Sequence, residues 1–332
     1  MRFRVISWIV VVFSAAGCFT PAEIAYEVGC FYQFAITILL VLAGCEGAGS
    51  GPSAKNREYT TFGKPERVTI QGYSDHAMEP FITADGRYLF FNNSNDPSVN
   101  TNLHYAERIN DITFKYKGEI KGVNTRALEG VPTMDRNGNF YFISTRSYDQ
   151  TMSTIYRGRF AGGVVTGINL VENLSEKRLN HVNFDVEISP SGDSLYFVDG
   201  VFTRPTVPDK ADIAIARREG SGFRRWEKSA EVLKNINTDG LEYAVCISPD
   251  ELELFFTRLR NFGFAIYRST RKTVAEPFEL PERLTAIEGF VEAPTLTADG
   301  RSLYYHKKDG DRFVIYRVTR SLAKAPASNN GG

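Results

Sequence analysis

The chain has 332 residues, of which 42% are hydrophobic and 23% are charged. These fractions are typical of a globular protein with a large buried core, and they exclude a disordered, collagen-like or polytopic membrane chain. Because 39 basic residues balance 39 acidic ones, no net charge attracts the protein to nucleic acid, and we expect no nucleic-acid partner.

Residues 1–44 predict an export segment. Two basic residues precede an apolar run that ends at Cys18, and a second apolar run, from Phe31, ends at Cys45. Each run is shorter than the roughly 20 residues that a membrane-spanning helix needs, and it suits the apolar core of a signal peptide. The alternative is a pair of short helices that insert into a membrane.

Residues 42–45 are Leu-Ala-Gly-Cys, which resembles the lipobox of bacterial lipoproteins. The resemblance implies cleavage before Cys45 and lipidation of its thiol, with Cys18, after a similar Ala-Ala-Gly, as the rival site. Residues 45–57 are rich in Gly, Ser and Ala and predict a flexible tether. We therefore expect an exported, periplasm-facing lipoprotein of a bacterial cell envelope that meets the membrane through its lipid anchor only.

Residues 58–320 repeat one pattern five times, and this repetition decides the predicted fold. Each repeat has two short strands joined by a tight turn, and the turn position falls at Gly86, Gly138, Gly192, Glu251 and Gly300. Glycine supplies the positive φ that a tight hairpin turn requires. Glu251 lacks that freedom, so its turn is predicted to differ. The second strand of each pair is almost continuously apolar, which predicts burial on both faces.

A third strand with more alternation follows in every repeat, and a fourth strand follows in the first four. The fifth repeat lacks a fourth strand, because the chain continues after Arg320 only as a tail, residues 321–332, that we expect to be disordered. Residues 65–70 closely parallel residues 281–286, the fourth strand of the fourth repeat. The sequence therefore predicts an all-β fold: a five-bladed β-propeller of four-stranded antiparallel blades, closed by an N-terminal strand.

The turns Thr-Ala-Asp-Gly and Ser-Pro-Asp, each followed by an aromatic strand and then by Ile-Tyr, resemble the WD40-like propeller repeat of TolB-type periplasmic proteins. The resemblance extends over about residues 60–320, in all five copies. It implies a propeller located in the periplasm, in agreement with the export segment.

Every repeat carries an acidic residue just before its first strand, and these are the candidate ligand-binding residues: Glu79, Glu129, Asp185, Glu242 and Glu292. The first strands of a propeller line a central channel, and the loops that enter them open at one mouth, the usual ligand face. A ring of carboxylates there can bind a cation, a sugar or a basic peptide. The simpler interpretation is that the acids accept hydrogen bonds from neighbouring blade loops, because they fall at different distances before the turn.

Basic residues follow the second strands of three repeats, and we expect them to form salt bridges between blades: Arg146, Arg258, Lys307 and Lys308. No phosphate-binding, dinucleotide-binding or serine-hydrolase motif is present, and the cysteines and histidines do not occur at metal-ligand spacing. We therefore expect no cofactor and no metal.

The sequence thus favours a monomeric, non-catalytic propeller that binds an envelope protein or polysaccharide through one mouth of its ring. The alternative is a glycan-acting enzyme, since several glycosidase families have five-bladed propellers with acids around the axis. That reaction needs two carboxyl groups about 5–10 Å apart, and Glu79, Glu129 and Asp185 are the candidates.

Overall fold

The computed structural model describes residues 59–96, 100–203, 207–261 and 263–323. The predicted export segment, Cys45, the tether and residues 324–332 of the predicted tail lie outside this part of the chain. The described residues form 21 strands and two one-turn helices, α1 (Tyr148–Thr151) and α2 (Ser229–Val232). Neither helix has the length and apolar composition needed to cross a membrane.

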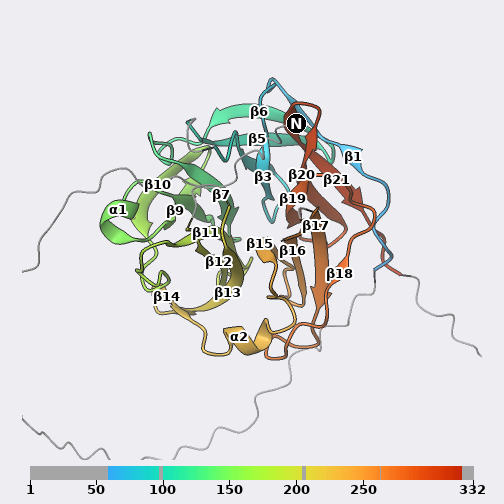
Figure 1. Cartoon of the computed structure of the whole chain (residues 1–332). Coiled ribbons are helices and arrows are strands. Elements are labelled where there is room, and N and C mark those ends of the chain that lie inside the picture. The colour runs from blue at the N-terminus through green and yellow to red at the C-terminus, as the bar shows by residue number, and fades with distance from the viewer. Residues whose placement is uncertain (1–58, 97–99, 204–206, 262, 324–332) are drawn as a thin grey trace, which may run out of the picture. The chain divides into compact units, whose positions relative to one another are not determined.

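Most strands form five antiparallel groups, one for each sequence repeat (Figure 1). In chain order the groups are β3 (Met78–Ile82), β4 (Tyr88–Asn92), β5 (Leu103–Asn110) and β6 (Thr113–Glu119); β7 (Glu129–Met134), β8 (Asn139–Ser144), β9 (Ile155–Ala161) and β10 (Val164–Leu170); β11 (His181–Ile188), β12 (Ser194–Val201), β13 (Lys210–Glu219) and β14 (Gly222–Arg225); β15 (Leu241–Ile247), β16 (Glu253–Arg260), β17 (Gly263–Thr270) and β18 (Glu282–Arg283); and β19 (Val291–Leu296), β20 (Ser302–Asp309) and β21 (Arg312–Thr319). A single parallel pair, Ala211 with Leu241, joins the third and fourth groups into one sheet. The fold is therefore all-β, as the sequence predicts.

The tight turn between the first two strands has the same hydrogen bond in every repeat. The N–H of the turn residue donates to the carbonyl oxygen three residues earlier, and its φ is positive in all five turns. Glu251 makes this bond to Ser248 at 2.8 Å with a φ of 58°, so the prediction that its turn differs is wrong. A left-handed residue other than glycine costs about 1–2 kcal/mol. The Glu251 carboxylate offsets this cost, because Ser194 Oγ and Arg217 Nη1 of the third repeat donate to it at 2.8 and 3.1 Å.

The hydrophobic core lies between neighbouring repeats. The second strands supply fully buried aromatic side chains, including Phe90, Phe140 and Phe197, which confirms the predicted burial of these strands. Phe90 packs edge-on against Phe140 of the next repeat, with ring centroids 5.4 Å apart. Phe114 of the first repeat packs in the same way against Tyr304 of the fifth, at 6.1 Å. Such edge-to-face pairs stabilise the contact beyond the area that they bury.

The N-terminal segment of the described chain contacts the fifth repeat and then the first. β1 (Glu66–Arg67) pairs antiparallel with β21, and the Glu66 carboxylate lies 2.6 Å from Arg317 Nη2. The buried Val68 donates its N–H to Ile315 O at 2.9 Å. β2 (Thr69–Gln71) then pairs in parallel with β6. Residues 65–70, which the sequence placed entirely beside the fifth repeat, are thus divided between two sheets, because the chain turns there toward β3.

The first strands of the five repeats meet at the centre of Figure 1. β3 contacts β7, β7 contacts β11, β11 contacts β15, β15 contacts β19, and β19 contacts β3. Each contains a β-bulge at which its register with the second strand shifts. In four of them the bulge holds a left-handed residue: Glu79, Val131, Ala244 and Ala293. Bulges re-aim side chains, and Glu79 is the polar residue among these four.

Candidate functional site

All five acids that the sequence singled out are buried, with exposed fractions of 5% or less. Their surroundings divide them into two groups. Glu129 and Glu242, here called the bridged acids, each form a salt bridge with an arginine. Glu79, Asp185 and Glu292, here called the axial acids, form none with any arginine or lysine among the described residues, and they interact electrostatically with one another.

Glu129 of β7 is held by its own repeat and by the loop that precedes it. Arg146 Nη2 lies 3.2 Å from the carboxylate, and Ser144 Oγ donates to it at 2.8 Å. The N–H and the hydroxyl of Thr125 add bonds of 2.9 and 2.8 Å. The carboxylate is therefore neutralised and fully hydrogen-bonded, which is the arrangement of a structural acid.

Glu242 of β15 repeats this arrangement. Arg258 Nε lies 2.6 Å from its carboxylate, and the N–H and hydroxyl of Thr238 donate to it at 3.0 and 2.7 Å. In both cases the acid and the arginine belong to the same repeat, so the predicted salt bridges between blades are wrong for Arg146 and Arg258. The register explains this, because Glu242 stands directly opposite Arg258 on the paired strand.

The two bridged acids share a local sequence motif, which the pattern of repeats did not single out. The segment Asn-Thr-x-x-Leu-Glu occurs at residues 124–129 and again at 237–242. In each copy the asparagine side chain both accepts from and donates to the backbone of one residue, Leu103 or Ile213, in the third strand of the preceding repeat. Among the described residues, Lys307 of the fifth repeat has no such acid, and its Nζ lies 5.5 Å from the ring centroid of Tyr316.

The axial acids come from three different first strands. Burial raises the pKa of Glu79 to about 7, although Asn95 Nδ2 donates to its carboxylate at 2.8 Å. Burial also raises the pKa of Asp185 well above its usual value, and the negative charge of Glu79 raises it further. The Asp185 carboxylate accepts the N–H of Ala244 at 3.0 Å. Burial, with smaller contributions from Glu79 and Asp185, likewise raises the pKa of Glu292.

Two neighbours of Glu292 were not foreseen from the sequence. The hydroxyl of Tyr243 donates to its carboxylate, and His306 Nε2 lies 3.4 Å from its second oxygen. Burial lowers the pKa of His306 to about 3, so the imidazole is neutral. Its Nδ1 accepts the backbone N–H of Glu79 at 3.1 Å, which assigns the ring proton to Nε2, on the side of Glu292.

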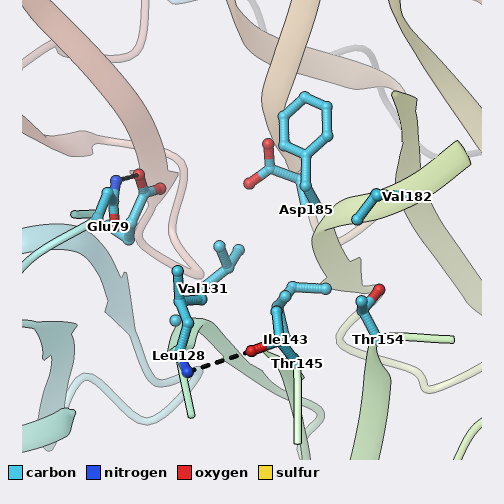
Figure 2. Close-up of a pocket in the computed structure, with 11 residues that line it drawn as sticks. Glu79, Leu128, Val131, Ile143, Thr145, Thr154, Val182 and Asp185 are labelled. Carbon is cyan, nitrogen blue, oxygen red and sulfur yellow. Dashed lines mark hydrogen bonds between the residues drawn. The ribbon is translucent and has the colours of Figure 1, made fainter. Parts of the chain in front are cut away.

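The carboxyl groups of Glu79 and Asp185 face the same open space, which apolar side chains enclose on the other sides (Figure 2). This cavity has a volume of about 20 Å³, and its apolar wall includes Val131, Ile143 and Val182. A second cavity of about 20 Å³ touches residues of all five first strands and is also lined by Glu79 and Asp185. Each cavity has room for about one water molecule.

Glu187 of β11 faces the second cavity. Burial raises its pKa to about 8, and Thr133 Oγ1 donates to its carboxylate at 2.7 Å. Within the described residues, no three His, Cys, Asp or Glu side chains converge in a way that would hold a metal ion.

No protein-family model matches the chain, and no curated protein does. Among solved structures, a family 117 glycoside hydrolase of Zobellia galactanivorans has a TM-score of 0.52 at 11% identity, over 79% of this chain and 91% of that chain. The catalytic domain of the GH62 α-L-arabinofuranosidase of Coprinopsis cinerea has a TM-score of 0.51 at 10% identity, over 81% and 99%. A putative TolB from Agrobacterium tumefaciens has a TM-score of 0.39 at 22% identity over 61% of this chain, which spans 64% of that protein's length.

The fold is that of a β-propeller. Antiparallel sheets whose first strands contact one another in turn are the mark of this architecture. The two glycoside hydrolases are 10% and 11% identical to this chain, so their likeness shows the fold alone and carries no chemistry over to the axial acids.

Proposed function

We propose that this protein is a five-bladed propeller, closed by β1, that works as an exported, lipid-anchored and non-catalytic binding module. Its ligand is a protein or an envelope polymer, bound at the mouth where the first strands begin. Support for five blades comes from the unbroken order of contacts from β3 through β19 and back to β3. Support for closure comes from the pairing of β1 with β21. The anchor rests on the sequence around Cys45.

The first of the two cavities, between Glu79 and Asp185, is here called the axial cavity. Its small size is the observation that carries this proposal. Small-molecule sites enclose roughly 300–1,000 Å³, whereas the space between Glu79 and Asp185 is about 20 Å³. A sugar ring does not fit between these carboxyl groups. The ligand therefore rests on the rim of the mouth and sends no more than a narrow group toward the axial acids.

A glycan-acting enzyme is the second candidate, and one observation favours it. Glu79 and Asp185 share a cavity, burial raises the pKa of both carboxyl groups, and the negative charge of Glu79 raises the pKa of Asp185 further. One of the two can therefore hold a proton while the other is ionised, as in the acid and base pairs of hydrolases. Glu129, the third candidate from the sequence, is neutralised by Arg146. This second function requires the axial cavity to widen enough to admit a sugar.

Site-specific photo-crosslinking in cells tests the binding mouth. A crosslinking side chain at Leu179, which is 63% exposed in the loop before β11, should give a discrete adduct. The same group at Ala298, exposed in the turn after β19 at the other end of the ring, is the matched control. Adducts from Ala298 alone, or from neither site, would remove this mouth as the binding face.

A glycan hydrolysis screen separates the two candidate functions. It compares the purified protein with Glu79→Gln and Asp185→Asn. Turnover of any glycan that both variants abolish would replace the binding module by the enzyme. No turnover, together with an adduct at Leu179, would eliminate the enzyme.

A further inference from the structure

We propose that the axial cavity receives the side chain of a lysine from an exposed basic segment of a protein partner. This inference rests on the proposed binding mouth and names the chemistry of what enters it. The guest is an ammonium group on a chain of methylenes, held between the carboxylates of Glu79 and Asp185.

The first reason for a cationic guest is the charge of the Glu79 and Asp185 carboxylates. Each of the two carboxylates receives a single hydrogen bond, from Asn95 to Glu79 and from Ala244 to Asp185, each to one of its two oxygens. Within the described chain, neither second oxygen has a hydrogen-bond donor or a cationic partner, and both carboxyl groups face the cavity (Figure 2). Buried carboxylates without a cation are costly. A cationic group that supplies donors to these two oxygens removes that cost.

The shape of the cavity is the second reason. The whole cavity has room for about one water molecule, which is the size of an ammonium group but too small for a planar guanidinium or a sugar ring, so the end of the lysine stem lies at its rim. The lining includes the aliphatic side chains of Val131, Ile143 and Val182, with Thr145 and Thr154 beside them. Methylene stems of lysine pack well against such walls while the charged head reaches polar groups. A free metal ion is the poorer guest, because no three ligating side chains of the described chain converge there.

The surroundings of Glu79 make the interaction depend on pH. The titratable groups that face it are Asp185, Glu292, Tyr243 and the neutral His306. Glu79 has a pKa of about 7 without a guest, so the ammonium group binds its ionised form and must compete with a proton below that pH. Binding should therefore be tighter at pH 8 than at pH 6, by up to about tenfold for one competing proton.

Calorimetric titration of the full chain tests the proposal with three short peptides. The probes are acetyl-Gly-Lys-Gly-amide, the same peptide with its lysine ε-acetylated, and the peptide with arginine in place of lysine. The lysine peptide should bind at least tenfold more tightly than the other two. Equal binding of the acetylated peptide, or tighter binding of the arginine peptide, would overturn the lysine guest.

Two variants place the effect in the cavity. Glu79→Gln keeps an acceptor for Asn95 but removes the charge, and it should weaken lysine-peptide binding at least tenfold and abolish the difference between pH 6 and pH 8. Asp239→Asn is the control, because Asp239 is an exposed acid in the loop before β15, paired with Arg260 at 3.0 Å. It should change binding less than twofold. Equal losses in both variants would mean that only the general charge of the mouth matters.

The pH dependence of the unmodified protein needs no substitution, so it remains decisive where a variant folds poorly. Constant lysine-peptide affinity from pH 6 to pH 8 contradicts the proposal. The outcome also separates this inference from the binding module. An adduct at Leu179 without a preference for lysine refutes the guest alone, whereas the absence of any adduct at Leu179 refutes the binding mouth itself.

Discussion

Replacing Glu79 by glutamine should make the folded protein more stable at neutral and higher pH. Folding raises the pKa of this buried carboxyl from 4.5 to about 7. Below pH 4.5 the group is protonated in both the folded and the unfolded chain, and it costs little. As the pH rises from 4.5 through 7, the unfolded chain releases its proton first, so the folded state loses up to about 3 kcal/mol relative to the unfolded chain.

Glu79→Gln removes this loss, and the glutamine oxygen can still accept the bond from Asn95. Urea unfolding should show that the variant's free energy of unfolding is higher than that of the unmodified protein by about 3 kcal/mol at pH 8, and by much less at pH 5. Glu129→Gln is the matched contrast, because it breaks the salt bridge with Arg146 and should lower the stability at both pH values. A Glu79→Gln variant that is destabilised equally at pH 5 and pH 8 would refute the argument that this acid is an uncompensated buried charge.

Three further predictions concern the rest of the chain. Arg258→Met leaves the fully buried Glu242 carboxylate without its cation, and it should lower the free energy of unfolding, measured with urea, by about 3–5 kcal/mol. Adding Glu242→Gln should recover part of this loss. A double variant no more stable than the single one would contradict the reasoning. Removing every residue before Gly72 deletes β1 and β2, so the exposed sheet edges should cause aggregation in light scattering, whereas deleting residues 46–57 should leave a folded monomer. Cys45→Ala should abolish metabolic palmitate labelling, and unchanged labelling would rule out the anchor.

The repeats were readable from the sequence because their causes are local. A turn residue at Gly86 or Gly138 is specified by the few positions around it, and the apolar second strands follow from the hydrophobic pattern alone. These signals predicted the all-β fold and the five antiparallel groups. The anchor at Cys45 lies outside the described residues and stays a prediction.

Glu251 shows where local reasoning failed. The turn chemistry of one repeat predicts an altered turn there, but the hydrogen bonds that offset its left-handed φ come from Ser194 and Arg217, in the preceding repeat. Partners so distant in sequence leave no local pattern. A rule derived from one turn therefore gives the wrong answer when another sheet stabilises that turn.

The sequence by itself determined that an acidic residue stands at the entrance of every first strand, and only the tertiary structure decided which of them reach the axis. Glu129 and Glu242 meet arginines of their own repeats, whereas Glu292 stands opposite His306 on the paired strand. Glu79 is turned inward by a β-bulge, next to a histidine more than 200 residues away, at 306. The physical reason is that burial and unpaired charge depend on neighbours that the packing of the sheets brings together, and these contacts are not encoded in the spacing of the acids along the chain.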